Sequence, residues 1–312
     1  MQQRTLGRTG ISVSEVSLGG LFLQAESRES GVALVRAALD RGITFFDTAP
    51  SYGISQLILG EALENEKRPH VVATKVGPTR ECFSEGAYDR DSVLRQFETN
   101  LKELRRDRVD LLFIHDPDRC ARPYPGALSP MLGKGMALEA ALELRDQGVV
   151  RAVGLASLWL DYQAKCIESG MLDLVLTFNR YGLIWRDARF ELFPFCERRG
   201  VGVIQATPLH QGIFAAPRPE WIERPPAWMT PIEHNRYRRL LQIQSAAAIP
   251  LPELAIRYIL QSESIDTVLC GAANLEQLDA NIACSDKGPL PTDLQAEIES
   301  LGIMHEDPRR FQ

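Results

Sequence analysis

Short apolar runs alternate with longer helical segments along the whole chain, and this alternation limits its possible folds more than any other feature. Eight runs rich in β-branched or apolar residues are each followed by apolar residues at helical spacing. The expected strands are residues 16–18, 44–46, 71–74, 111–114, 152–154, 174–176, 202–205 and 267–269. The expected helices are residues 31–40, 56–64, 92–105, 137–145, 162–168, 190–198, 254–261 and 275–283. Repeated βα units of this kind predict an α/β fold with a parallel sheet.

The spacing of the units favours a closed (β/α)8 TIM barrel. Successive strands mostly lie about 24 to 40 residues apart, the size of a βα repeat in such a barrel. An open doubly wound sheet would be favoured by a G-x-G-x-x-G motif after the first strand, but only a Gly19-Gly20 turn stands there. The 312 residues allow one large core, so we expect a single domain over residues 1–312, although the length also permits two.

Two segments fall outside the repeat. Residues 4–13 hold Gly7 and Gly10 between short extended pieces, which predicts an N-terminal β-hairpin that caps the floor of the barrel. The gap between residues 205 and 267 is far longer than the others and is rich in proline, with Trp221 and Trp228 interleaved. Long loops of this composition are usually functional or mobile, so we expect a lid after strand seven, over the mouth of the barrel.

Composition limits the classes of partner that the protein can bind and indicates its cellular compartment. The formal net charge is −6 and no block of Lys or Arg occurs, which argues against nucleic acid and anionic membrane surfaces as partners. No apolar run is long enough for a membrane span, and the polar amino terminus does not resemble a signal peptide. The six cysteines are scattered without metal-ligand spacing, so we expect no metal site and a cytoplasmic protein that acts on a small molecule. The oligomeric state stays open.

Four polar residues follow three consecutive strands. Asp47 comes after strand two, Tyr52 lies in the same loop, Lys75 ends strand three and His115 ends strand four. In a TIM barrel the carboxyl ends of the strands form one face, where active sites lie. Each residue alone has a structural explanation, as a solvated cap, a buried histidine or a packed tyrosine. Their joint occurrence at one rim favours chemistry.

The set suits hydride transfer to a carbonyl, which leaves an alkoxide that must receive a proton. Tyr52 would exchange that proton, and we expect the ammonium of Lys75 to lower the pKa of the phenol. Asp47 would hold Lys75, while neutral His115 would donate to the substrate oxygen. A lyase or isomerase that uses Lys75 in a Schiff base is an alternative, but a neighbouring carboxylate would raise the pKa that such chemistry needs lowered.

The same stretches resemble the successive signatures of the aldo-keto reductase superfamily. They read RTLGRTGISVSEVSLGG, GITFFDTAPSYG, VVATKVG, LLFIHDPD, GLAS, QATPLHQGIF and GAANLEQLDANIA, and they span nearly the whole chain. The resemblance implies that Asp47, Tyr52, Lys75 and His115 form the catalytic tetrad of that superfamily. LLFIHDPD and VLTFNRYGLI look most like the branch of bacterial L-fucose and D-threo-aldose 1-dehydrogenases, with pyridoxal dehydrogenase as a near relative.

The resemblance also implies a nicotinamide cofactor, NAD or NADP, in the mouth of the barrel. The residues implied to bind it are Gly19, Gly20, Asp47, Ser157, Asn179, Tyr181, Thr207, Pro208, Leu209, Gln211, Gly212, Gly271, Ala272, Asn274, Gln277 and Asn281. Two departures affect the carboxamide contacts. Leu158 stands where the family usually has Asn. The usual Gln before the stacking aromatic residue is displaced, which leaves the roles of Thr177, Asn179 and Tyr181 open.

The sequence says less about the substrate and about the choice between NAD and NADP than about the catalytic residues. We expect the substrate to contact Tyr52, His115, Asp116 and Phe22, with a polar side that suggests hydroxyl groups. In the family, NADP-dependent members place Lys or Arg on the turn after strand eight, whereas residues 271–281 hold no cation, so NAD is favoured. The alternatives are a general aldehyde or ketone reductase, a pyridoxal dehydrogenase, and a barrel subunit that senses the nucleotide without turnover.

Overall fold

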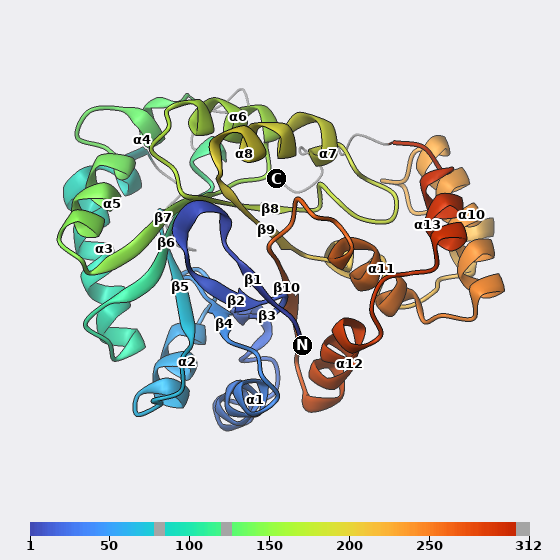
Figure 1. Cartoon of the computed structure of the whole chain (residues 1–312), viewed down its shortest axis with the longest axis horizontal. Coiled ribbons are helices and arrows are strands. Elements are labelled where there is room, and N and C mark those ends of the chain that lie inside the picture. Colours follow the sequence, from blue (N-terminus) through green and yellow to red (C-terminus); the bar gives the residue numbers. More distant parts are fainter. Residues whose placement is uncertain (78–84, 120–126, 304–312) are drawn as a thin grey trace.

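The computed structural model describes residues 1–77, 85–119 and 127–303. Eight parallel strands close into a barrel in the order β10-β3-β4-β5-β6-β7-β8-β9 (Figure 1). Their bounds are β3 Val16–Gly19, β4 Phe45–Asp47, β5 Val71–Val76, β6 Val109–His115, β7 Val150–Ala156, β8 Leu174–Phe178, β9 Gly202–Ala206 and β10 Thr267–Gly271. All eight strands expected from the sequence are therefore confirmed, with ends that differ by at most two residues.

Helices surround the barrel and join its strands (Figure 1). They are α1 Arg28–Asp40, α2 Ser55–Leu63, α3 Arg90–Leu104, α4 Ser129–Leu132, α5 Ala137–Asp146, α6 Leu160–Glu168, α7 Ala188–Glu191, α8 Phe193–Arg199, α9 Glu220–Glu223, α10 Pro231–Ala247, α11 Leu251–Leu260, α12 Leu275–Asp286 and α13 Thr292–Glu299. The helix expected over 190–198 is divided into α7 and α8 because Pro194 begins a new helix. Within the described residues no helix has the length and apolar character to cross a membrane.

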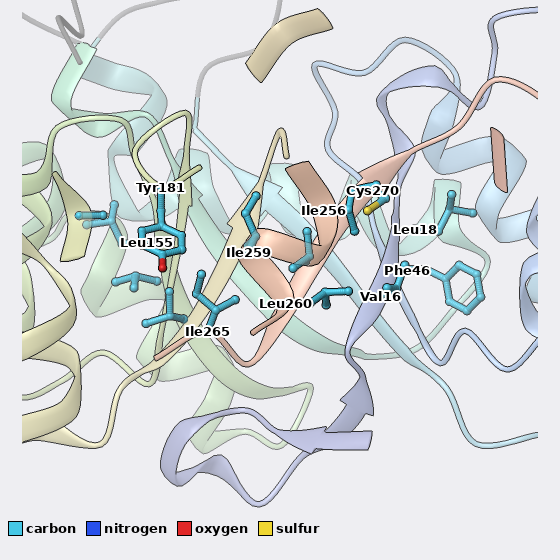
Figure 2. Packing of buried hydrophobic residues seen from close by; sticks show 14 of the residues in the cluster. Val16, Leu18, Phe46, Leu155, Tyr181, Ile256, Ile259, Leu260, Ile265 and Cys270 are labelled. Carbon is cyan, nitrogen blue, oxygen red and sulfur yellow. The ribbon is translucent and has the colours of Figure 1, made fainter. Parts of the chain in front are cut away.

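Two apolar clusters divide the core. One fills the barrel, where Phe45, Leu111, Phe113 and Ile204 point inward. The other lies between the strands and the surrounding helices, and Figure 2 shows part of it, with side chains of α11 beside those of β3 and β10. Because side chains alternate along a strand, every second residue faces the barrel interior. The four cysteines in the described part of the chain are free and buried in the outer layer, whereas Cys82 and Cys120 lie outside the described residues.

The expected hairpin closes the floor of the barrel. Strands β1 Gln3–Thr5 and β2 Ser12–Ser14 are antiparallel, and Leu6, Ile11 and Val13 join the apolar cluster inside the barrel. The backbone amide of Gly7 donates to Asp266 Oδ2 at 3.0 Å, next to the start of β10. The hairpin therefore plugs the amino-terminal end of the barrel, opposite the face where the strands end.

The long segment after β9 is more ordered than its sequence suggested. It contains α9 and the 17-residue helix α10, which lies beside α13 in Figure 1. Thr230 caps α10: its hydroxyl accepts from the amide of Glu233, whose side chain accepts from the amide of Thr230. Trp221 packs against Trp228 and against Tyr237 of α10. These contacts explain the aromatic residues by packing, and closure over the barrel mouth stays a prediction.

The hairpin yields a stability prediction with a matched control. Gly7 and Gly10 both have positive φ, 44° and 71°, so alanine at either position costs about 1–2 kcal/mol in backbone strain. A Cβ on Gly7 would also lie 2.3 Å from the amide nitrogen of Gly202, whereas one on Gly10 would meet nothing within 4 Å. We expect Gly7→Ala to lower the free energy of unfolding at least about 1 kcal/mol more than Gly10→Ala in urea titrations. Equal losses would contradict the plugged floor.

Candidate active site

The last inward-facing residue of each strand defines the rim of the barrel mouth. Asp47, Lys75 and His115 have the same parity as Phe45, Ala73 and Phe113, which point into the barrel, so all three face inward. Their strands β4, β5 and β6 are hydrogen-bonded neighbours. The structure thus brings these predicted residues together on one half of the rim.

The other half of the rim is nearly bare. The corresponding last inward positions are Ala156 on β7, Phe178 on β8, Ala206 on β9, Gly271 on β10 and Gly19 on β3. Gly271 and Gly19 lie directly opposite each other in the parallel pair. Four of these five strands thus end in a small residue at this position. The sequence analysis missed Phe178 and Ala206, although their alternation with Leu176 and Ile204 could have revealed them.

A buried ion pair lies at the centre of the polar half. Lys75 Nζ is 2.6 Å from both carboxylate oxygens of Asp47 and 2.9 Å from the backbone oxygen of Thr48. Lys75 and Asp47 are 1% and 3% exposed. The side chain of Asn100 on α3 donates to the backbone oxygen of Lys75 at 2.8 Å and fixes this end of β5 from behind.

Tyr52 lies over this pair. Lys75 Nζ is 4.8 Å from the centroid of the Tyr52 ring, and the ring of His115 meets it edge-on at a centroid distance of 6.1 Å. A hydrogen bond of 3.0 Å from the amide of Tyr52 to the oxygen of Ala49 shapes the loop. All four residues expected from the sequence, the tetrad Asp47, Tyr52, Lys75 and His115, therefore share one site.

Burial controls protonation in the tetrad. Burial, with the charges of Asp47 and Asp116, raises the pKa of Tyr52 well above its ordinary value. The net shift is therefore opposite to the lowering that the sequence analysis expected from Lys75, because burial and the two carboxylates raise the pKa of this phenol. Burial lowers the pKa of His115 to about 4, so its imidazole is neutral near pH 7. Burial likewise lowers the pKa of Lys75 and raises that of Asp47, and the attraction within the pair opposes both shifts.

Comparison with known proteins agrees with this geometry. The model of the Aldo/keto reductase family matches residues 15–303. The chain belongs to this family. Aldo/keto reductases are oxidoreductases that use nicotinamide cofactors.

Several relatives carry names of dehydrogenases. The chain is 30% identical to L-galactose dehydrogenase from Arabidopsis thaliana, over 98% of this chain and 92% of the relative. It is 30% identical to D-threo-aldose 1-dehydrogenase from Pseudomonas sp, over 92% of each. It is 27% identical to pyridoxal 4-dehydrogenase from Microbacterium luteolum, over 97% of this chain and 98% of the relative. The holo form of an aldo-keto reductase from Bacillus halodurans shares the fold, with a TM-score of 0.81, 24% identity and 99% of each chain covered.

The family resemblance implied that Tyr181 or Asn179 meets the nicotinamide ring or its carboxamide. The side chain of Tyr181 packs in the outer apolar layer, and a contact of either residue with the cofactor stays a prediction. Asn179 has φ of 59° and turns the chain out of β8. Tyr181 then stacks on Tyr258 at 5.8 Å and packs against Phe193 at 5.3 Å in the outer apolar layer (Figure 2). Thr177, two residues before Asn179, shares the outward parity of Val175 and also faces away from the barrel interior.

The implied carboxamide region lies at the ends of β7 and β8. Ser157 is buried, and its hydroxyl accepts from the amide of Trp159 at 3.3 Å. Asn179 Oδ1 accepts from the hydroxyl of Thr207 at 2.8 Å, while buried Asn179 Nδ2 has no hydrogen-bond partner among the described residues. A buried amide that lacks an acceptor, next to the bare half of the rim, fits a ligand that carries a carbonyl group, as a nicotinamide does.

The loop implied to hold the pyrophosphate follows β9. Thr207, His210, Gln211 and Gly212 all have positive φ, and the amides of His210 and Gly212 donate within the loop. Pro208 is buried and Leu209 half-buried. The loop is therefore a tight turn that is closed by its own backbone hydrogen bonds.

The turn after β10 is braced by the side chains expected to meet the adenosine. Gln277 Oε1 accepts from the amide of Ala273 at 2.9 Å, Asn274 Oδ1 accepts from the amide of Gln277 at 3.0 Å, and Asn281 donates to the oxygen of Gly271 at 3.1 Å. Ala272 between them is buried. These hydrogen bonds cap the start of α12 and fix the turn that precedes it.

Gly20 and Phe22 complete the first turn after β3. A Cβ on Gly20 would lie 2.5 Å from the backbone oxygen of Asp47, so only glycine fits beside the tetrad. Phe22 is 52% exposed, and its ring covers Gly271 so closely that a Cβ there would lie 2.7 Å from it. The expected substrate residue Phe22 thus stands at the bare half of the rim, next to β10.

The turn after His115 holds two carboxylates. Asp116 has φ of 48°, and its Oδ2 pairs with Arg119 at 3.2 Å, while its buried Oδ1 has no hydrogen-bond partner within the described residues. Asp118, which the sequence analysis did not single out, is fully buried. Burial and the charge of Asp116 raise the pKa of Asp118 to about 7, and the side chain of Ser157 opposes this rise. The only sequence signal for it is the second acid of HDPD.

Asp118 predicts a pH dependence of stability. The folded protein holds a proton on this carboxyl up to about pH 7, whereas the unfolded chain releases it near pH 4, so the free energy of unfolding falls as pH rises between those values. We expect Asp118→Asn to remove a decline on the order of 3 kcal/mol between pH 4.5 and 8, measured by urea titration at each pH. The exposed-site variant Asp107→Asn should keep the wild-type slope. Parallel curves for Asp118→Asn and wild type would contradict the raised pKa.

Proposed function

We propose that this aldo/keto reductase is an NAD(P)-dependent aldose 1-dehydrogenase, which moves a hydride between a nicotinamide cofactor and C1 of an aldose. The observation that carries the proposal is the buried Lys75–Asp47 pair beneath the Tyr52 ring, with neutral His115 alongside and a bare half-rim opposite. The net charge of −6 supports action on a small molecule without nucleic acid or membrane, and we place the enzyme in the cytoplasm.

The tetrad divides the proton chemistry. The bound nicotinamide supplies or accepts the hydride. Tyr52 carries the proton that the substrate oxygen gains on reduction, and its raised pKa keeps it protonated near pH 7. Neutral His115 donates a hydrogen bond to the same oxygen. Oxidation of the sugar reverses these steps and needs ionised Tyr52, so its rate increases with pH.

Lys75 and Asp47 act by position and charge. All three protons of the Lys75 ammonium are engaged, by both oxygens of Asp47 and by Thr48. An amine so held is a poor nucleophile, which argues against the Schiff-base alternative. The positive end of the pair faces the Tyr52 ring and stabilises the phenolate when oxidation requires it.

The substrate class rests on the turn after His115. Asp116 Oδ1, which has no hydrogen-bond partner within residues 1–77, 85–119 and 127–303, would accept from a sugar hydroxyl, and neighbouring Arg119 would donate to another. The names of two relatives, L-galactose dehydrogenase and D-threo-aldose 1-dehydrogenase, support the same class. The second candidate function is that of a pyridoxal dehydrogenase. It is supported by the relative named pyridoxal 4-dehydrogenase, and pyridoxal also carries hydroxyl groups around its reactive carbon.

A substrate panel tests the proposal. Oxidation of L-galactose, L-fucose and other aldoses with NAD and NADP would be compared with turnover of pyridoxal and of aliphatic aldehydes. We expect kcat/KM to be highest for an aldose. Highest values for pyridoxal would select the second candidate, and highest values for aliphatic aldehydes would indicate a general reductase. Cofactor binding without turnover of any of them would indicate a nucleotide-sensing barrel.

The first prediction from the proposed function concerns Tyr52→Phe, which removes the proton carrier and keeps the ring above Lys75. We expect kcat to fall by about 10²-fold or more, the usual contribution of a positioned acid or base, while the Kd for NADH changes less than about threefold. Steady-state rates and fluorescence titration measure the two quantities. Near-wild-type turnover would remove Tyr52 from the mechanism.

The second prediction concerns the cofactor. Residues 271–281 contain no Lys or Arg, and Arg41, which approaches α12, is held by Asp279 at 3.2 Å. Nothing on this turn pairs with a 2′-phosphate, so we expect kcat/KM with NAD to equal or exceed that with NADP. A preference for NADP above about tenfold, roughly 1.4 kcal/mol, would contradict this expectation.

Variants at Gln277 distinguish the effect of an added charge on cofactor preference from the effect of a changed turn geometry. Gln277→Arg should shift the ratio of kcat/KM values toward NADP by about tenfold, because it adds a phosphate partner. Gln277→Leu is the matched control, since it loses the same hydrogen bond to the Ala273 amide without adding charge. A shift in both variants would assign the effect to the turn rather than to the cation.

A further inference from the structure

The loop after β9 adopts an unfavourable backbone conformation. Thr207, His210 and Gln211 have φ of 53°, 47° and 53°, a region in which residues other than glycine lose on the order of 1–2 kcal/mol each. His210 and Gln211 are adjacent, so the strain is concentrated at one bend. Such conformations persist only where the surrounding structure fixes them. Something outside the loop must therefore hold it.

The ring of His210 is stacked on Trp185. The two rings are nearly parallel, with an interplanar angle of 7° and a centroid distance of 3.9 Å. Phe214 closes another side, 5.9 Å from His210 and 6.2 Å from Trp185. His210 is 4% exposed and Trp185 is 1% exposed. The stack is thus a buried aromatic contact that fixes the bend through its side chain.

Trp185 is fixed in turn by the start of α10. Its indole Nε1 donates to Glu233 Oε1 at 3.2 Å, and Glu233 Oε2 accepts from the amide of Thr230 at 2.7 Å. Glu233 is buried and belongs to the capping box of that helix. A continuous set of contacts therefore links the loop after β9, through His210 and Trp185, to the inserted helix α10.

We propose that the Trp185–His210 stack is a positioning device for dinucleotide binding, which holds the loop after β9 in the bent conformation that receives the pyrophosphate. The inference rests on the proposed function, because it takes this loop as part of the cofactor site. Neither residue contacts the tetrad in the described interactions, so both act on cofactor affinity rather than on proton transfer. The inserted helix α10 then serves as the anchor of the stack.

Substitutions at His210 separate the stack from the backbone preference. His210→Asn tolerates positive φ but removes the ring, and His210→Phe keeps a stacking ring. We expect His210→Asn to raise the Kd for NADH, measured by fluorescence titration, by about tenfold, with kcat at saturating NADH within about twofold of wild type. Phenylalanine should keep the Kd within about threefold of wild type.

Two tryptophan variants provide a partner test and a matched control. Trp185→Leu removes the other half of the stack and should reproduce the rise in Kd. Trp221→Leu removes a tryptophan of the same inserted segment that packs on Tyr237 and does not contact the loop in the described interactions. It should lower Tm without changing the Kd. Where His210→Asn fails to fold, Trp185→Phe keeps a smaller ring and reports a smaller rise in the same Kd.

The outcomes distinguish failure of the proposed function from failure of the positioning role. A wild-type protein that binds neither NADH nor NADPH would overturn the proposed function, and the positioning role with it. A wild-type protein that binds, together with His210→Asn or Trp185→Leu variants of unchanged Kd, would overturn the positioning role alone. An equal rise in Kd for Trp221→Leu would show a general loss of packing and would also overturn it.

Discussion

The site depends on the ion pair between Lys75 and Asp47, which lies almost fully out of reach of water. Removing two charges from water costs several kcal/mol per ion, and only close, fully satisfied geometry compensates for that cost. Here the three protons of the ammonium meet three oxygens, so no donor is left over. The pair locks β4 to β5 at the rim and sets the position of the loop that carries Tyr52. Loss of either partner would leave an uncompensated charge in the barrel mouth.

The strands could be predicted from periodicity, and the tetrad from its positions after predicted strands together with the resemblance to the aldo-keto reductase signatures. Apolar runs at regular intervals define the strands, and the parity of side chains then carries Asp47, Lys75 and His115 inward together with Phe45 and Phe113. In a parallel barrel the active site lies at the carboxyl face, where these strands end. The N-terminal hairpin could also be predicted from a local pattern, because its glycines stand between short extended pieces.

Other features depend on tertiary contacts that no local pattern encodes. The side chain of Tyr181 packs in the outer apolar layer, because the left-handed Asn179 redirects the chain behind the barrel. The raised pKa of Tyr52 arises from burial and from the charges of Asp47 and Asp116, whose combined effect a sequence cannot weigh against a nearby ammonium. Helix α10 is different, because the Thr-Pro-Ile-Glu sequence at its start is a readable capping signal that the proline-rich context concealed.

The closure of the barrel joins its two most distant strands. Strand β3 pairs with β10, and the hydroxyls of Ser17 and Thr267 meet at 2.6 Å across that seam. At a synthesis rate of about 5–20 residues per second, the growing chain waits roughly 10–50 s after β3 emerges from the ribosome before β10 is available. During that interval the apolar face of every earlier strand lacks its final enclosure. The late seam therefore delays the closure of the barrel until nearly the whole chain has been made.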